Sequence, residues 1–287
     1  MPFLPTLVDA LLDGSLVEGF PGDGRLDPLA LANVTIWVPT RRAARELAGE
    51  FVGRFEGNVA LLPSIRTLGG IDGGEDDLDL EDLAALMGPE SDPHVAPAQR
   101  QLILSRLVFQ WSQSLNQTQR DLYRGADILM PSSLSDAVWF AAELARLMDT
   151  IATEEVDWAQ LQGLVEQDHA NWWQLTLEFL KIASAQWPEI LAELHLSDAA
   201  TERAKSIRRQ ADAYTVQGSA GPVIAAGSTG SIPATADLLK AIAHLPNGVV
   251  VLPALDRDLD NETWEQIDLP DNPTMPAARR RVIRNTA

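Results

Sequence analysis

The chain contains no cysteine, and this absence removes several kinds of chemistry at once. Disulfide bonds, thiol nucleophiles, and zinc or iron–sulfur sites built from cysteine ligands are all excluded. A chain without cysteine is consistent with the cytoplasm, and we expect a cytoplasmic protein.

Long apolar runs are also missing. No run of about eighteen apolar residues occurs, so we expect no membrane span and no membrane partner. The opening residues, MPFLPTLVDALLDG, lack the positively charged start and the small-residue cleavage site of a signal peptide.

Positive charge is scarce. The 287 residues include 41 acidic and 22 basic side chains, which gives a net charge of −19, and only three of the basic residues are lysine. Nine acidic residues fall between Asp72 and Asp92, where there is no lysine or arginine. A negative field repels phosphate backbones, so the chain as a whole is not suited to nucleic acid, although local patches remain candidates.

The most informative stretch is residues 221–256, GPVIAAGSTGSIPATADLLKAIAHLPNGVVVLPALD. Short apolar runs at 222–226 and 249–252 predict two buried strands, and the apolar stripe over 232–245 predicts a helix between them. We therefore expect a parallel strand pair. The loop 227–231 then lies beyond the carboxyl end of the first strand, where ligands usually bind in such sheets.

A second strand–turn–helix unit is predicted near the N-terminus. Residues 34–38 are apolar and β-branched, Pro39 and Thr40 end that strand, and 41–55 has the spacing of an amphipathic helix. A short helix is expected over 3–12, and a further strand around 59–65.

From Pro97 the pattern changes to one helix after another, without a strand signal. Ser133 and Asp136 have the spacing of a capping box, and helices are expected over 171–187 and 199–214. We predict an α/β protein whose parallel sheet carries a large inserted all-helical subdomain. The expected segments are α/β residues 1–70, an acidic loop at 71–96, helical residues 97–218, α/β residues 219–260 and an irregular tail at 261–287.

The loop Gly227-Ser228-Thr229-Gly230-Ser231 has two interpretations. Its hydroxyls are suited to cap the following helix, or its backbone N–H groups and hydroxyls contact an anion or nucleic acid. No lysine follows it, so it is not a phosphate-binding P-loop, and it fits neither GxSxG nor GxGxxG.

Thr40, Arg41 and Arg42 lie at the start of the helix predicted over 41–55, and they also have two interpretations. They form either a capped helix start with solvated arginines or a site that holds a phosphate group. Arg208 and Arg209 have the same two interpretations, as solvated surface arginines or as a site that holds a phosphate group.

No catalytic or metal-binding constellation is present. The four histidines are scattered, the acidic run lacks EF-hand spacing, and no Ser/His/Asp set stands out. Five tryptophans lie beside apolar helical stripes, which favours core packing over base stacking: Trp111, Trp139, Trp172, Trp173 and Trp187.

Four segments resemble, in order, the N-terminal part of AddB, the helicase-like and nuclease-bearing subunit of the bacterial AddAB double-strand-break repair complex. They are VTIWVPTRRAARELAGEF, PAQRQLILSRLVFQW, NWWQLTLEFLKIASAQWPEIL and AAGSTGSIPATADLLKAIAHLPNGVVVLPALD. The similarity covers about residues 3–268, and GSTGSIPATADLL is its most specific piece.

The resemblance implies a RecA-like fold of the superfamily-1 helicase type, an AddA-like partner subunit, and contact with single-stranded DNA or duplex ends. The family's Mg²⁺-dependent nuclease, with its iron–sulfur cluster, has no counterpart here, and AddB proteins are far longer. Residues 3–12 contain no GK[ST], which argues against ATP binding. We expect a segment without its own cofactor, ATPase or nuclease activity, and the alternative is a scaffold that docks a partner without touching DNA.

Overall fold

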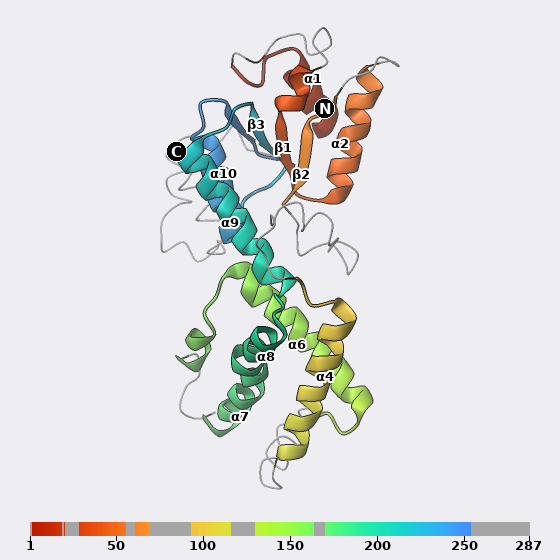
Figure 1. Ribbon diagram of the computed structural model, residues 1–287, viewed down its shortest axis with the longest axis vertical. Helices are drawn as coiled ribbons and strands as arrows, with labels where there is room; N and C mark the ends of the chain where they lie inside the picture. Colours follow the sequence, from red (N-terminus) through yellow and green to blue (C-terminus); the bar gives the residue numbers. More distant parts are fainter. Residues whose placement is uncertain are drawn as a thin grey trace. The chain divides into compact units, whose positions relative to one another are not determined.

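The computed structural model describes residues 2–18, 20, 29–55, 61–68, 93–115, 130–163 and 170–253 (Figure 1). The chain forms two compact units, one from residues 1–86 and 204–287 and the other from residues 87–203. Residues 71–92 of the predicted acidic loop, and the whole predicted tail at 261–287, lie outside the described residues.

The first unit is built on a parallel sheet of four strands in the order β2-β1-β3-β4. The strands are β1 (Thr35–Val38), β2 (Ser64–Thr67), β3 (Val223–Ala226) and β4 (Gly248–Val251). Ile36 pairs with Ile65 of β2 and with Ile224 of β3, and Ile224 pairs with Val249 of β4. The predicted α/β class and the predicted parallel pair are therefore confirmed.

Strand β2 begins at Ser64, later than the expected start near residue 59. Pro63 precedes it, and proline lacks the N–H group that a ladder needs, so the strand begins where N–H donors resume. Ser64 N donates to Val34 O at 2.9 Å.

Helices cover both faces of the sheet. Helix α1 (Phe3–Leu12) and helix α2 (Arg41–Arg54) pack on one face, where Ile36 and Ile224 point. Helix α9 (Ala199–Gln217), from Ala204 onward, and helix α10 (Pro233–Ala243) pack on the other face with Trp37 (Figure 1). Successive side chains of a strand point to opposite faces, so strands buried on both sides read as continuous apolar runs.

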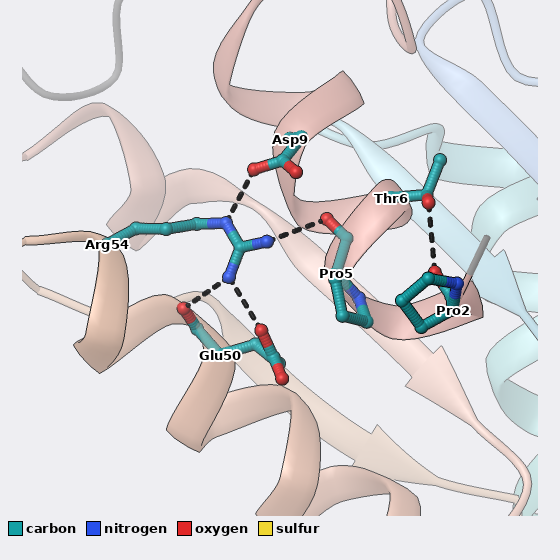
Figure 2. A network of polar contacts seen from close by, with 6 residues as sticks. All are labelled: Pro2, Pro5, Thr6, Asp9, Glu50 and Arg54. Carbon is teal, nitrogen blue, oxygen red and sulfur yellow. Dashed lines mark hydrogen bonds and ion pairs between the residues drawn. The ribbon is translucent and has the colours of Figure 1, made fainter.

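Arg54 of α2 makes polar contacts with α1. Figure 2 shows Arg54 reaching from the last turn of α2 to Asp9, Pro5 and Glu50. Its Nε lies 2.6 Å from Asp9 Oδ1, its Nη1 lies 2.6 Å from Glu50 Oε2, and its Nη2 donates to the carbonyl oxygen of Pro5 at 3.0 Å. The hydrogen bond to Asp9, with that to Glu50, raises the pKa of Arg54 despite its burial.

We expect Arg54→Met to lower the free energy of unfolding by about 1–3 kcal/mol, because the variant loses several hydrogen bonds to a charged group that is mostly buried. The Arg54 side chain is only 17% exposed. Arg42→Met is a matched control on the same helix. Arg42 also pairs with a glutamate four residues later, but its side chain is 88% exposed, so a change within about 0.5 kcal/mol is expected. Urea unfolding of both variants measures the change in the free energy of unfolding. Equal losses in the two variants would contradict a stabilising role of the Arg54 contacts.

The second unit is helical in its described part. It contains α4 (Pro97–Ser114), α6 (Leu134–Glu154), a 3-10 helix (Trp158–Gly163), α7 (Ala170–Lys181), a π-helical turn (Ile182–Gln186) and α8 (Trp187–Leu194). Leu104 and Val108 of α4 pack against Ala141 and Leu144 of α6 in its core. Ser133 and Asp136 form the predicted capping box at the start of α6.

The prediction that the five helical tryptophans pack in the core is confirmed in part. Trp187 is buried in the helical core and Trp111 packs against it, but Trp139 is 54% exposed. The buried stripe of α6 runs through Ala137 and Ala141, and Trp139 lies about 200° around the helix from Ala137. The side chains of Trp172 and Trp173 are outside those that the structure describes.

Candidate functional site at the carboxyl ends of the strands

The sheet order creates a point where the chain leaves two neighbouring strands in opposite directions. From β1 the chain passes through α2 to β2, and from β3 it passes through α10 to β4. Helices α2 and α10 lie on opposite faces, so the carboxyl ends of β1 and β3 are not covered by one helix. In parallel sheets this arrangement opens a crevice that commonly holds a ligand.

The two predicted loops lie next to each other at this switch point. Thr40, Arg41 and Arg42 follow β1, and Gly227 to Gly230 follow β3, its neighbour in the sheet. A methyl group on Gly227 would lie 3.5 Å from Pro39 Cδ and 3.5 Å from a ring carbon of Phe3. The loops are therefore in close proximity, and the start of α1 lies beside them.

Thr40 caps helix α2. Its Oγ1 accepts a hydrogen bond from Ala43 N at 3.1 Å, which satisfies one of the N–H groups that the first turn leaves without a helical partner. Arg41 is partly buried, whereas Arg42 is exposed with its Nε 2.9 Å from Glu46 Oε1. The predicted cap is confirmed, but of the two arginines expected to be solvated only Arg42 is exposed. The phosphate interpretation is not tested.

The glycine loop turns as its sequence requires, because Gly227 and Gly230 adopt φ values of 86° and 64° that favour glycine. Ser228 Oγ accepts from Gly230 N at 3.3 Å. The prediction that loop hydroxyls cap the next helix is wrong: the N-cap of α10 is Ile232, which makes no side-chain cap. Pro233 starts the helix and has no N–H group to satisfy, so a hydroxyl cap is less needed.

The electrostatics of this edge favour an anion. The N-termini of α2 and α10 both lie at the carboxyl ends of the strands, and each carries partial positive charge. Arg41 and Arg42 carry positive charges at the start of α2, although the charge of Arg42 is paired with Glu46, and Thr229 is exposed in the glycine loop. Within the described ranges, no three His, Asp or Glu side chains gather as potential metal ligands. The arrangement is suited to binding an anionic group.

A buried polar network in the helical unit was not predicted from the sequence. Arg100 Nη2 lies 2.8 Å from Asp149 Oδ1, and Arg100 Nε lies 3.2 Å from Asp198 Oδ2. Trp187 Nε1 donates to the same Asp198 oxygen at 3.0 Å. Burial acts to lower the pKa of Arg100, but Asp149 and Asp198 outweigh it and the pKa is raised. The network joins α4, α6, α8 and the start of α9.

A short parallel β-bridge joins His94 to Ser197 within the helical unit. Val95 N donates to Ser197 O at 3.1 Å, and Ser197 N donates to Pro93 O at 2.9 Å. The side chains repeat the contact, because His94 Nδ1 and Ser197 Oγ lie 2.8 Å apart. We call Pro93, His94, Val95 and Ser197 the neck of the helical unit.

His94 of the neck makes the free energy of unfolding depend on pH. Burial lowers the pKa of His94 below its usual 6.5, although Glu202 and Asp198 oppose the shift. As the pH falls below 6.5 the unfolded chain takes up this proton before the folded chain does, so stability decreases until the folded pKa is passed. We expect His94→Gln to lose less stability than the wild type between about pH 7.5 and about pH 5.5. Thermal unfolding followed by circular dichroism measures this, and parallel pH profiles would contradict it.

No protein-family model, curated protein or solved structure matches the chain. Fold and site together define an α/β protein with a four-stranded parallel sheet and a candidate anion-binding edge between β1 and β3. None of the helices in the described part of the chain has the length and apolar character needed to cross a membrane.

Proposed function

We propose that the chain is the N-terminal, helicase-like part of an AddB-type repair subunit. Its role is to contact DNA and a partner helicase–nuclease subunit during resection of DNA ends. The observation that carries this proposal is the meeting of two loops, Thr40 to Arg42 and Gly227 to Gly230, at the switch point between β1 and β3.

The RecA-like interpretation of the fold belongs to the same proposal. A parallel sheet with helices on both faces is the expected core of such a domain. The unit of residues 87–203, helical in its described part, separates the chain segments of β2 and β3, which fits a subdomain inserted into that core.

The environment of this edge of the sheet favours binding over nucleotide hydrolysis. A phosphate-binding loop would present backbone N–H groups and a lysine to the nucleotide. Here the ring of Phe3 lies beside Gly227, and the opening segment has no GK[ST]. Arg41 and Arg42, with the two helix N-termini, are suited to a phosphate backbone instead.

The double variant Arg41→Ala with Arg42→Ala tests the DNA contact. We expect affinity for a single-stranded oligonucleotide to fall about 5- to 30-fold, and the salt slope to decrease by about one for each phosphate group that the variant no longer neutralises. Fluorescence anisotropy between about 50 and about 200 mM salt measures both quantities. Arg146→Ala is the matched control, because Arg146 is an exposed helical arginine paired with Glu143 in the other unit.

An unchanged salt slope in the double variant would remove the assignment of Arg41 and Arg42. A wild-type chain that binds no DNA, but binds an AddA-type subunit, would favour the alternative function of a scaffold. Exposed apolar side chains on the helical unit are the observation that favours this alternative. ATPase activity in the isolated chain would contradict both functions.

A further inference from the structure

A cavity lies between helices α9 and α10, which pack side by side in the unit that carries the sheet (Figure 1). Its volume is about 580 Å³, within the usual range of small-molecule sites. Its walls are residues 208–218, from α9 and the turn after it, and residues 237–246, from α10 and the turn after it. We call this space the α9/α10 cavity.

The α9/α10 cavity is separate from the candidate anion site. Gly218 and Pro246 line it, and they precede β3 and β4 in the chain. The cavity therefore extends toward the amino ends of these strands, whereas Thr40 and Gly227 follow the carboxyl ends of β1 and β3. The proposed DNA contact makes no use of it.

The lining of the cavity has an apolar part. Ala211 and Tyr214 of α9, Ala241 of α10 and Leu245 contribute to it, and all four are buried members of the core beneath these helices. Such a surface accommodates the apolar body of a ligand, while polar groups around it fix the orientation.

One pair of opposite charges in the lining is already satisfied. Arg208 Nη1 of α9 forms an ion pair with Asp237 Oδ2 of α10. The pair links the two helices, and each partner compensates the charge of the other.

A second pair of opposite charges lines the same cavity without pairing. Asp212 of α9 and Lys240 of α10 are both exposed. In the described part of the chain, neither side chain takes part in a hydrogen bond or an ion pair. Two opposite charges that share a cavity but do not meet leave a gap, and a ligand with both an ammonium group and a carboxylate can bridge it.

His244 adds a hydrogen-bond acceptor to the lining. Its Nδ1 donates to the carbonyl oxygen of Lys240 at 2.7 Å, so in the neutral imidazole Nε2 is the acceptor. The C-termini of α9 and α10 lie at the same end of the cavity, because Asn247 Nδ2 donates to the carbonyl oxygen of Gly221. Their partial negative charge, with Asp212 and His244 Nε2, favours an ammonium group, and Lys240 favours a carboxylate.

We propose that the α9/α10 cavity binds a small zwitterion with an apolar body, the class of apolar amino acids and short peptides. The ammonium group of the ligand pairs with Asp212 and His244, and its carboxylate pairs with Lys240. A ligand with charge of a single sign fits less well, because it leaves either Asp212 or Lys240 without a partner.

Leucyl-leucine and leucine are the two probes, and isothermal titration calorimetry with the full chain measures their affinities. We expect Asp212→Asn and Lys240→Met each to weaken binding of leucyl-leucine about three- to tenfold, because each removes one charged contact at an exposed position. Lys205→Met is the matched control: Lys205 is an exposed lysine of α9 that does not line the cavity, and its replacement should leave the affinity unchanged.

Blocked dipeptides identify the charge that each residue meets. N-terminal acetylation should weaken binding to the wild type but cause no further loss in Asp212→Asn. C-terminal amidation should weaken binding to the wild type but cause no further loss in Lys240→Met. Both outcomes support the proposed orientation, and the tighter of the two free probes shows whether an amino acid or a peptide is the ligand.

The inference is overturned if the wild type binds neither probe, or if it binds the free and the doubly blocked dipeptide equally. Circular dichroism checks that the variants fold, which is expected because Asp212 and Lys240 make no side-chain bond to the described residues. None of these results depends on whether the chain binds DNA, so this inference and the proposed function succeed or fail separately.

Discussion

Gly248→Ala is expected to lower the free energy of unfolding by about 3 kcal/mol, because the new methyl group has no space in a packed region. It would lie 1.9 Å from the carbonyl oxygen of Ile242 and 2.8 Å from Leu245 Cβ. Gly221→Ala should act in the same way, since its methyl group would lie 2.0 Å from the carbonyl oxygen of Asn33. In both cases the obstacle is backbone, which cannot move aside as a flexible side chain does.

Two glycines of α2 provide a control of opposite sign. Apart from the nearby backbone of α2 and the adjacent residues, no heavy atom lies within 4 Å of a methyl group added at Gly49 or Gly53. Alanine at either position should stabilise the protein by about 0.5–1 kcal/mol, because glycine loses more backbone entropy in a helix. Urea unfolding of the four variants measures these values. A neutral Gly248→Ala variant would show that the connection from α10 to β4 is not packed this closely.

Trp37→Ala should lower the free energy of unfolding by about 3–5 kcal/mol, as large-to-small changes at fully buried aromatic residues do. Trp37 is completely buried, and its Nε1 donates to Tyr214 Oη at 3.2 Å. The guanidinium carbon of Arg66 lies 5.6 Å from the centre of the Trp37 ring. The side chain therefore joins β1, β2 and α9 through packing, a hydrogen bond and a cation–π contact.

Trp37→Phe separates these contributions. It keeps an aromatic face for Arg66 but leaves a cavity and removes the donor to Tyr214, so a loss of about 1–3 kcal/mol is expected. Trp139→Ala is the exposed control and should change stability by less than about 1 kcal/mol. Equal losses at Trp37 and Trp139 would contradict the burial that the fold assigns to Trp37.

The helices and strands follow closely from local sequence. The apolar run at 222–226, the helix predicted over 232–245 and the run at 249–252 match β3, α10 and β4 within one or two residues. These elements are predictable because buried parallel strands are uniformly apolar and amphipathic helices repeat every 3.6 residues. The helix predicted at 171–187 differs, since a π-helical turn at Ile182–Gln186 precedes a new helix at Trp187, next to Pro188.

The candidate site was predictable as two loops but not as one place. Each loop follows a strand, and this much is local information. Their meeting depends on β3 pairing with β1, and the helical unit separates these strands in the sequence. The Arg100 network could not be predicted for the same reason, because Asp149 and Asp198 are far from Arg100 in the sequence.

The neck determines how strongly an insertion or deletion in the helical unit affects the sheet. Hydrogen bonds join Pro93 and Val95 to Ser197, so the two ends of the helical segment are already held together within that unit. The entropy lost in closing a loop grows only slowly with its length, and a loop whose ends are tied together is closed in advance. Insertions or deletions between residues 97 and 194 should therefore cost the sheet little more entropy than changes in a short surface turn.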